Sequence, residues 1–318
     1  MTPSREDPVD QLLEIGLKDL WYPICPSGFI KESPVSLRRL GRKFAFWRDH
    51  SGKLHALEDR CPHRGAPLSQ GVILGDRLSC PYHGVEVRCD GVAVRVPGSP
   101  GCKLEGSQST RFFHVEERAG AVWLYNAKES VATPPPLVLP EQLSDDEQYS
   151  SFLCYAEWKG DYRYVLDNVM DPMHGTFLHK QSHSMAEGDS TAKFGIRATD
   201  TGLHWMRLEI PYPKTGGPGG NFGIVGSYTP ISPTLSCAFH WRVRKLAKGW
   251  ERDTWRFLYK NRLEARHWHV LEQDRVLIEN MEPDANQHEQ LYQHDLGIVR
   301  LRRHLRGLAQ QQLEGATA

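Results

Sequence analysis

Two short segments decide how the first part of this chain folds: Cys61-Pro62-His63 and Cys80-Pro81-Tyr82-His83. Each segment supplies one cysteine and one histidine, and the prolines and glycines around them favour tight loops. A set of two thiolates and two imidazoles suits a structural Zn²⁺ ion. Zinc fingers, however, usually pair cysteine with cysteine and histidine with histidine. The mixed pairs favour a two-iron cluster with cysteine on one iron and histidine on the other, and they leave zinc as the alternative.

The composition around these segments is that of an ordinary globular protein. Of the 318 residues, 39% are hydrophobic and 25% are charged, so the chain can bury a core. The 39 basic and 39 acidic residues cancel, which argues against a general nucleic-acid-binding protein. No apolar run approaches the roughly 18–20 residues of a membrane span, and the polar, acidic N-terminus does not resemble a signal peptide. We therefore expect a cytoplasmic protein whose seven cysteines are thiols or metal ligands.

Short strand patterns surround the two segments, and a proline run follows them. Apolar or aromatic runs at 43–47, 54–57, 92–96 and 121–125 predict strands, separated by turns rich in glycine, proline and aspartate. The run Pro134-Pro135-Pro136 can continue neither a helix nor a central strand, so it indicates a boundary. We expect an N-terminal segment at 1–19, a first domain at 20–130, a linker at 131–148 and a second domain at 149–318.

The second domain is predicted to mix helices and strands. Residues 162–170, 267–281 and 295–312 show helical patterns, and 191–245 alternate apolar and polar positions as antiparallel strands do. Strands followed by segregated helices indicate the α+β class. The fold expected for the whole chain is therefore an N-terminal all-β domain followed by a C-terminal domain of antiparallel sheet and helices.

A second group of candidate ligands lies in the segment Asp171-x-x-His174-x-x-x-x-His179. Residues five apart on one regular helix point about 140° apart, which is poor for a shared metal. Pro172 and Gly175 allow the chain to leave helical geometry, so that the two histidines can converge. The alternative is a pair of surface or core histidines with no metal role.

A carboxylate that could complete a facial triad comes from helical periodicity in residues 267–281. One stripe of this predicted helix contains His267, Val270, Leu271, Leu277, Ile278 and Met281, and Asp274 lies at its centre. An ionised carboxylate within an apolar stripe is costly unless it is paired or bound to metal. A buried ion pair is the alternative, and His183 and Asp189 are competing ligands.

Together these motifs resemble those of the Rieske non-haem iron oxygenases over nearly the whole chain. The resemblance implies that a Rieske [2Fe-2S] cluster is held by Cys61, His63, Cys80 and His83. It also implies that a mononuclear non-haem Fe(II) is held by His174, His179 and Asp274. In that family the residue matching Asp171 accepts a hydrogen bond from a metal-bound histidine and links to a Rieske histidine of the neighbouring subunit. Asn168 matches a position often near the iron.

The short chain is similar to the phthalate dioxygenase and vanillate demethylase branch, which implies a head-to-tail homotrimer. The implied activity is that of a terminal oxygenase, which uses O2 to hydroxylate, dihydroxylate or demethylate a small substrate that is expected to be aromatic. The glycines at 216–220 lack the context of a dinucleotide fingerprint. Electrons are therefore expected from a separate NAD(P)H-dependent flavin reductase, with or without a ferredoxin.

The competing reading is a Rieske electron-transfer protein whose second domain only binds a partner. For the oxygenase, the substrate pocket is expected along the strands around 204–210 and 222–240. Trp205, Met206 and Phe222 in these strands suggest an aromatic or apolar substrate body, although they could equally be core residues. Several arginines are available to bind a carboxylate, and the sequence singles out none of them.

Overall fold

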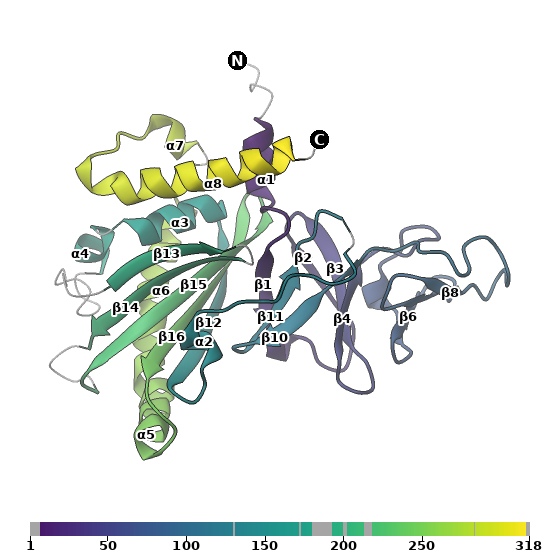
Figure 1. The fold of residues 1–318 in the computed structure, drawn as a ribbon, viewed down its shortest axis with the longest axis horizontal. Coiled ribbons are helices and arrows are strands. Elements are labelled where there is room, and N and C mark those ends of the chain that lie inside the picture. Colours follow the sequence, from purple (N-terminus) through teal and green to yellow (C-terminus); the bar gives the residue numbers. More distant parts are fainter. Residues whose placement is uncertain are drawn as a thin grey trace. The chain divides into compact units, whose positions relative to one another are not determined.

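The computed structural model describes residues 7–129, 131–171, 173–179, 193–199, 202–212, 218–282 and 284–315. The chain forms two compact units, one of Lys18–Leu137 and one that joins Met1–Leu17 to Val138–Ala318. The first unit is built from short strands, and the second combines one antiparallel sheet with helices (Figure 1). The predicted α+β class is therefore confirmed. No helix among the described residues is long and apolar enough to cross a membrane.

The unit Lys18–Leu137 contains three small antiparallel sheets. Their strand orders are β1-β11-β10, β2-β3-β4-β9 and β5-β6-β7-β8. The strands are β1 (Trp21–Pro26), β2 (Val35–Arg39), β3 (Arg42–Arg48), β4 (Leu54–Glu58), β5 (Val72–Ile73), β6 (Arg77–Ser79), β7 (Glu86–Arg88), β8 (Ala93–Arg95), β9 (Phe112–Phe113), β10 (Val115–Arg118) and β11 (Ala121–Tyr125). Short 3₁₀ turns occupy Ser27–Phe29 and Leu68–Gln70. The strands predicted at 43–47, 54–57, 92–96 and 121–125 correspond to β3, β4, β8 and β11.

Strand β3 is buried on both faces and separates two hydrophobic clusters. Phe44 and Phe46 pack into one cluster, while Ala45 and Trp47 pack into the other. This alternation follows from the two-residue period of a strand. The second cluster also contains Cys61 and Cys80, so both cysteines of the motif are anchored in the core of this unit.

The β3–β4 turn is organised by one carboxylate. Asp49 accepts hydrogen bonds from the Ser51 N–H at 2.8 Å, from the Ser51 hydroxyl at 2.6 Å and from the Lys53 N–H at 3.1 Å. His55 Nε2 lies 2.8 Å from the other carboxylate oxygen. An aspartate that accepts backbone N–H groups two and four residues later closes the turn and sets the register of the hairpin.

The second unit is built on a five-stranded antiparallel sheet in the order β12-β16-β15-β14-β13. Its strands are β12 (Tyr149–Lys159), β13 (Lys193–Thr199), β14 (Gly202–Pro211), β15 (Asn221–Ser232) and β16 (Leu235–Lys245). Its helices are α1 (Pro8–Glu14), α2 (Glu141–Ser144), α3 (Tyr162–Met170), α4 (His174–Leu178), α5 (Trp250–Leu258), α6 (Glu264–Glu279), α7 (Ala285–His288) and α8 (Leu296–Glu314). A π-helical turn at Tyr259–Leu263 joins α5 to α6, and a 3₁₀ turn at Gln293–Asp295 precedes α8. The antiparallel strands and three helices expected from the sequence are confirmed.

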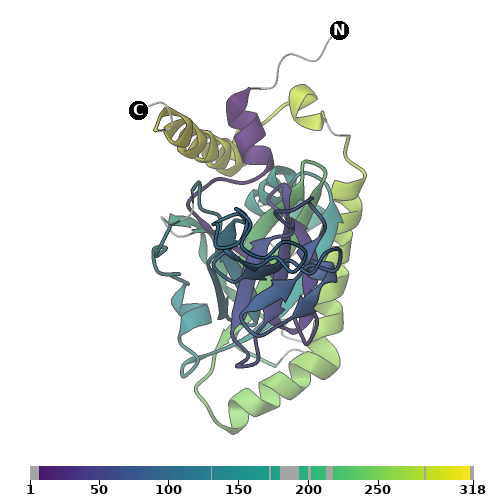
Figure 2. The same ribbon diagram turned by 90° about the vertical axis from the view of Figure 1, so that its right-hand side faces the viewer.

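Helix α6 runs along the sheet (Figures 1 and 2). Phe222 of β15 contacts the ring of His267, with ring centroids 5.5 Å apart. The buried residues of the helix are His267, Val270, Leu271, Asp274 and Ile278. Leu277 and Met281 were predicted to belong to the same stripe, but both are exposed. The helix ends at Glu279, and the buried stripe is narrower than a sequence-only helical wheel suggests.

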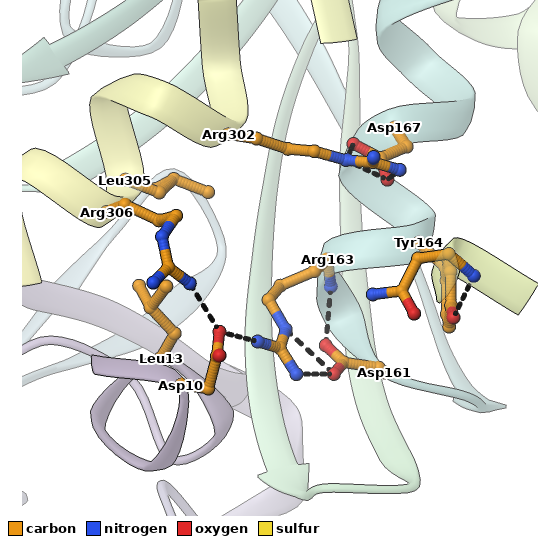
Figure 3. Close-up of a pocket in the computed structure, with 10 residues that line it drawn as sticks. Asp10, Leu13, Asp161, Arg163, Tyr164, Asp167, Arg302, Leu305 and Arg306 are labelled. Atoms are coloured by element: carbon orange, nitrogen blue, oxygen red, sulfur yellow. Dashed lines mark hydrogen bonds and ion pairs between the residues drawn. The ribbon is translucent and has the colours of Figure 1, made fainter. Parts of the chain in front are cut away.

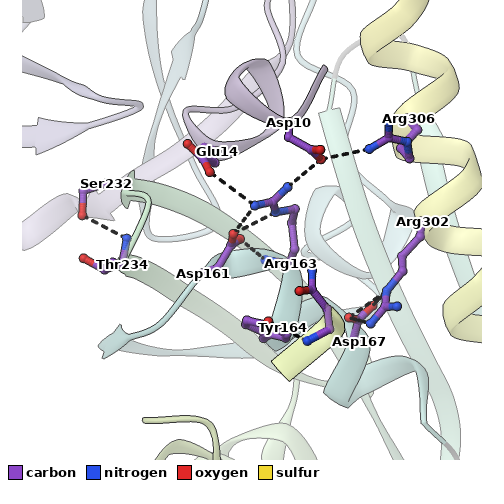
Figure 4. A network of polar contacts seen from close by, with 11 residues as sticks. Asp10, Glu14, Asp161, Arg163, Tyr164, Asp167, Ser232, Thr234, Arg302 and Arg306 are labelled. Atoms are coloured by element: carbon purple, nitrogen blue, oxygen red, sulfur yellow. Dashed lines mark hydrogen bonds and ion pairs between the residues drawn. The ribbon is translucent and has the colours of Figure 1, made fainter. Parts of the chain in front are cut away.

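An ion-pair network joins α1, α3 and α8 within this unit (Figure 4). Asp161 caps α3 by accepting the Arg163 N–H at 2.8 Å, and it also accepts from Nε of the same arginine at 2.8 Å. Arg163 also donates to Asp10 of α1 at 3.2 Å, and Arg306 of α8 donates to the same oxygen at 2.9 Å. Asp10 of α1 therefore links α3 to α8.

A second part of the network holds the C-terminal half of α3. Arg302 of α8 donates to Asp167 at 2.6 Å and is also paired with Glu289. The two parts of the network line one cavity of about 170 Å³, in which each guanidinium faces a carboxylate (Figure 3). The charged residues of its lining are Arg163, Arg302, Arg306, Asp10, Asp161 and Asp167. Because α3 leads directly to Asp171, this pairing supports the segment that carries the histidines.

Asp49→Ala should lower the free energy of unfolding by about 1–2 kcal/mol, because the turn N–H groups lose their acceptor. The Ser51 hydroxyl, followed by His55, holds the pKa of Asp49 well below its ordinary value of 3.8. A carboxylate with a depressed pKa stabilises the fold above the ordinary pKa and loses this effect as the pH falls through the folded-state pKa. Urea titrations followed by circular dichroism should show a constant difference from pH 8 to 5 that shrinks below pH 4.

His50→Ala is the matched control, because His50 is the exposed neighbour in the same turn. Its unfolding free energy should stay within about 0.5 kcal/mol of wild type. If both variants lose the same stability, the Asp49 carboxylate does not organise the turn.

Candidate metal centres

The two cysteine-histidine segments form loops with the same backbone geometry. In each loop, 61–66 and 80–85, the cysteine N–H donates to the carbonyl of the sixth residue, at 2.7 and 2.8 Å. The fifth residue, Gly65 or Gly84, donates back to the cysteine carbonyl at 2.8 and 3.0 Å. These glycines have φ of 77° and 70°, a region that disfavours other residues. The sequence pattern therefore builds two equivalent ligand loops.

The loops bury the thiols and expose the imidazoles. Cys61 and Cys80 are 2% and 3% exposed, whereas His63 and His83 lie at the surface with ring centroids 4.7 Å apart. Burial raises the pKa of Cys61 to about 11, and the neighbouring Cys80 thiol adds to the effect. Two adjacent buried thiols become thiolates only when a cation compensates them, so this donor set fits a metal cluster.

The pairing of the four side chains fits a cluster better than a single zinc ion. Cysteine lies beside cysteine and histidine beside histidine, which fits two irons better than one zinc. A separate compact set of three candidate ligands, whose donor atoms all lie within 4.8 Å of one another, occurs elsewhere among the described residues.

That compact set is His174, His179 and Asp274. His174 Nε2 lies 3.8 Å and His179 Nε2 lies 3.2 Å from Oδ1 of Asp274. The two rings are nearly perpendicular, at 82°, with centroids 5.2 Å apart. Helix α4 starts at His174 and stops at Leu178, so His179 lies just past its end with φ −99° and ψ 13°. This departure from the helix is what lets histidines five residues apart converge.

Oxygen acceptors orient both imidazoles. His174 Nδ1 lies 2.8 Å from the backbone carbonyl of Asp171, and His179 Nδ1 lies 3.0 Å from Oε1 of Gln273. A carbonyl oxygen can only accept, so each Nδ1 carries the proton and each Nε2 presents a lone pair toward Asp274. This is the tautomer that a metal ligand needs. Gln273 was not found by sequence reasoning, although it directly precedes Asp274 on the same helix.

Asp274 is the strongest sign that this set of residues suits a cation. The residue is 7% exposed, and no donor among the described residues hydrogen-bonds to its buried Oδ1. Burial lowers the pKa of His174. Burial also opposes protonation of His179, but the neighbouring Asp274 carboxylate outweighs this and raises the pKa of His179. A buried carboxylate oxygen that faces two imidazole lone pairs fits a divalent metal ion.

Asp171 and Asn168 lie beside this set without belonging to it. The Asp171 carboxylate accepts the Met173 N–H at 2.6 Å and the His174 N–H at 3.1 Å, which holds the turn that leads into α4. The orienting contact to the imidazole comes from its backbone carbonyl, whereas the resemblance implied a carboxylate. Asn168 is half-buried on α3, and no described contact joins it to the three ligand side chains.

The expected substrate-binding strands have a defined face. Trp205 lies opposite Gly226, which lies opposite His240, so these positions share one side of the sheet. The rings of Trp205 and His240 are 5.3 Å apart, and Tyr228 donates to or accepts from His240 Nε2 at 2.8 Å. Met206, next along its strand, projects to the opposite side. The competing ligands His183 and Asp189, and the loop at 213–217, lie outside the described residues.

Comparison with known proteins supports the first of these centres. Residues 20–108 match the Rieske [2Fe-2S] domain family. The chain is 33% identical over 172 residues to the vanillate O-demethylase oxygenase subunit of Pseudomonas sp., a match that covers 54% of this chain and 48% of that protein. It is 31% identical over 165 residues to the oxygenase component of dicamba O-demethylase from Stenotrophomonas maltophilia, covering 52% and 48%. The chain thus spans about half the length of the curated relatives it matches.

Solved structures share the whole fold. The terminal oxygenase of carbazole 1,9a-dioxygenase from Novosphingobium sp. has a TM-score of 0.74 at 21% identity, over 95% of each chain. The oxygenase in a reduced oxygenase–ferredoxin complex of carbazole 1,9a-dioxygenase also gives 0.74 at 20% identity, over 94% of this chain and 93% of that one. The likeness therefore extends over both units, well beyond the Rieske match.

Gln273→Leu should weaken metal binding at His174, His179 and Asp274 by about 10- to 100-fold, because the His179 ring loses the acceptor that holds its tautomer. Chelator competition for Fe(II), with the cluster intact, measures this affinity. Gln273→Glu retains an acceptor and should bind more tightly than the leucine variant. Glu272→Gln, on the exposed neighbour, is the control. Equal affinities in the leucine variant and the control would show that Gln273 does not orient the ligand.

Proposed function

We propose, on the premise that residues 20–108 are a Rieske [2Fe-2S] domain, that this chain is the terminal oxygenase component of an aromatic-oxidising system. In this proposal Cys61, His63, Cys80 and His83 hold the cluster. A mononuclear Fe(II) is held by His174, His179 and Asp274. The substrate is a small aromatic molecule that is hydroxylated, dihydroxylated or demethylated with O2 as cosubstrate.

The observation that carries the proposal is the compact set around Asp274 Oδ1. Two imidazoles and one carboxylate supply three ligands on one side of a metal, a pattern typical of Fe(II) oxygenases. A bound Fe(II) with open positions would supply the chemistry of O2 activation. A protein that only carried electrons would have no need for a second buried site with an unpaired carboxylate oxygen.

The residues of the chain itself contribute orientation and exclusion of water. The Asp171 carbonyl and the Gln273 amide keep both imidazoles in the ligand tautomer. Arg302 of α8 holds Asp167 and thereby supports α3, which precedes the first ligand. His179 is 1% exposed, so bulk water has little access to this side of the site.

Electrons would enter through the exposed histidine edge of the cluster. His63 and His83 lie at the surface, whereas the cysteine side is buried, so a docked partner approaches the imidazoles. We infer a separate electron donor: an NAD(P)H-dependent flavin reductase, with or without a ferredoxin. The solved ferredoxin complexes of the carbazole oxygenase support this kind of partner. A cytoplasmic location would suit such a partner.

We also propose that the chain assembles as a homotrimer in which the cluster of one subunit serves the iron of the next. A closed head-to-tail ring gives every subunit the same donor and acceptor surfaces. Asp171 would then join the two centres through its carboxylate, which also accepts two backbone N–H groups at the start of α4. The support is the position of Asp171, which contacts a ligand histidine through its backbone while its carboxylate remains a quarter exposed.

The proposal is tested by counting metal and measuring turnover. The purified protein should contain three irons and two acid-labile sulfides per chain, as one [2Fe-2S] cluster and one mononuclear site require. With a reconstituted reductase it should oxidise members of a panel of aromatic acids and methyl ethers. Asp274→Ala should retain the visible spectrum of the cluster, lose one iron and lose turnover.

A fully loaded protein with only two irons per chain would favour the alternative, an electron carrier with a partner-binding second unit. Glu279→Ala is the control on the same helix, since Glu279 lies away from the ligand set and pairs with Arg275. If Asp274→Ala keeps three irons and turns over normally, another carboxylate completes the site.

Asp171→Asn tests electron transfer between the centres. Asparagine keeps one side-chain oxygen to accept the N–H groups at the start of α4, so α4 and both metals should remain, while the negative charge is lost. Oxidation of the prereduced cluster in a single turnover, with substrate and O2, should slow by at least about 10-fold. Asp171→Ala should in addition weaken iron binding, because both backbone N–H groups lose their acceptor. Wild-type rates in the asparagine variant would restrict Asp171 to a structural role.

A further inference from the structure

Arg242 of β16 is a buried cation in the catalytic unit. It is 2% exposed, although arginine is rarely buried without a paired anion. In the sheet register it lies opposite Phe152 of β12 and Ile224 of β15. Side chains opposite each other share a face, and so do residues two apart along a strand. Arg242 therefore shares a face with His240.

This face is the one that α6 covers. Phe152 stacks on Tyr259 of the π-helical turn before α6 with ring centroids 4.1 Å apart, and Phe222 contacts His267 of α6. Asp274 is a buried residue of the same helix. Burial raises the pKa of Tyr228, the charge of Asp274 raises it further and the charge of Arg242 lowers it, so both charges act at Tyr228. Arg242 therefore lies on the face of the sheet toward α6, the helix that carries the candidate metal ligand Asp274.

No described carboxylate balances this guanidinium. Among the described residues, Arg242 makes no ion pair, and its buried Nε has no acceptor. His240, two residues earlier on the same face, has a buried Nδ1 that also lacks a partner there. An arginine offers five N–H donors and no acceptor, so the group that would satisfy it is rich in oxygen.

Several other buried or half-buried arginines described in this unit have identified acceptors. Arg244, on the same strand, donates to the Gly219 carbonyl at 2.8 Å and lies over the Tyr212 ring. Arg252 donates to three backbone carbonyls, and Arg163 and Arg302 are paired with aspartates. The lack of a described partner therefore distinguishes Arg242 from its neighbours.

Metal binding increases the need for an anion. A divalent ion held by one carboxylate and two neutral imidazoles leaves one positive charge, and Arg242 adds a second on the same side of the sheet. Two uncompensated positive charges in a buried region are strongly unfavourable. A mono-anionic molecule that enters between them removes much of this cost and gains a charge-assisted, bidentate contact.

We propose that Arg242 binds the carboxylate of an aromatic acid and so selects aromatic carboxylates as substrates. This inference rests on the proposed oxygenase function and names its substrate class. The aromatic ring of the acid would contact the aromatic residues of the same face, among them Trp205 and Tyr228, whose rings are 6.3 Å apart and stacked. The planar guanidinium would receive both carboxylate oxygens, a geometry that lysine does not reproduce.

The test compares benzoate with benzamide, its uncharged isostere, on the iron-loaded protein by isothermal titration calorimetry. Wild type should bind benzoate at least about 10-fold more tightly than benzamide. Arg242→Met, which preserves volume, should abolish this preference by weakening benzoate alone, and Arg242→Lys should lie between the two. Arg244→Met, on the same strand, should keep the preference. The thermal midpoint of Arg242→Met without ligand should equal or exceed that of wild type, because a buried cation has been removed.

Several results would overturn the inference. Equal affinity of wild type for benzoate and benzamide, or no benzoate binding, would show that no anion site exists. A lower thermal midpoint in Arg242→Met with an unchanged benzoate preference would show that Arg242 pairs with a carboxylate of this chain. If the methionine variant does not fold, the lysine variant decides, because an anion site predicts a reduced preference at full iron content. A wild-type protein that contains three irons and turns over neutral aromatic ethers supports the proposed function. If turnover by this protein does not depend on Arg242, this inference is refuted and the proposed function remains intact.

Discussion

The second unit is arranged around one buried carboxylate oxygen, Oδ1 of Asp274. This atom faces two imidazole nitrogens, and no donor among the described residues hydrogen-bonds to it. A carboxylate in that position is tolerable only with a compensating cation. Two helices meet there. Helix α4 contributes its first residue and the residue just beyond its end, and α6 contributes a residue from its middle. The ion pairs that join α8 and α1 to α3 support this meeting point from outside.

The first unit solves a similar problem with backbone geometry. Two loops of the same hydrogen-bond pattern extend from a core that includes both cysteines, so the thiols are buried and the imidazoles face solvent. A cluster held in this way is insulated on its cysteine side and accessible on its histidine side. The two units differ in what they expose: the first presents two candidate ligand histidines to solvent, and the second buries a candidate metal site next to the sheet face that carries Arg242.

Much of this organisation was readable from local patterns. The ligand loops depend on residue types and spacings within six residues, so the motif predicted them directly. Helix α3 was predicted at its observed bounds, since its pattern and the Asp161 cap are local. Asp274 was singled out because it interrupts an apolar stripe. Leu277 and Met281 were assigned to that stripe wrongly, because the width of the buried face depends on the curvature of the sheet against which α6 packs.

The sequence by itself determined the ligand types, the Rieske loops and the α+β class, because these depend on short-range spacing and on hydrophobic period. Only the tertiary structure decided that Gln273 orients His179, that the Asp171 carbonyl orients His174, and that Arg242 is the unbalanced cation. These features join residues that are far apart in the chain, or depend on which face of a strand is covered. Several arginines have similar sequence surroundings, and the register of β16 with β12 and β15 places Arg242 opposite Phe152 and Ile224, on the face that α6 covers.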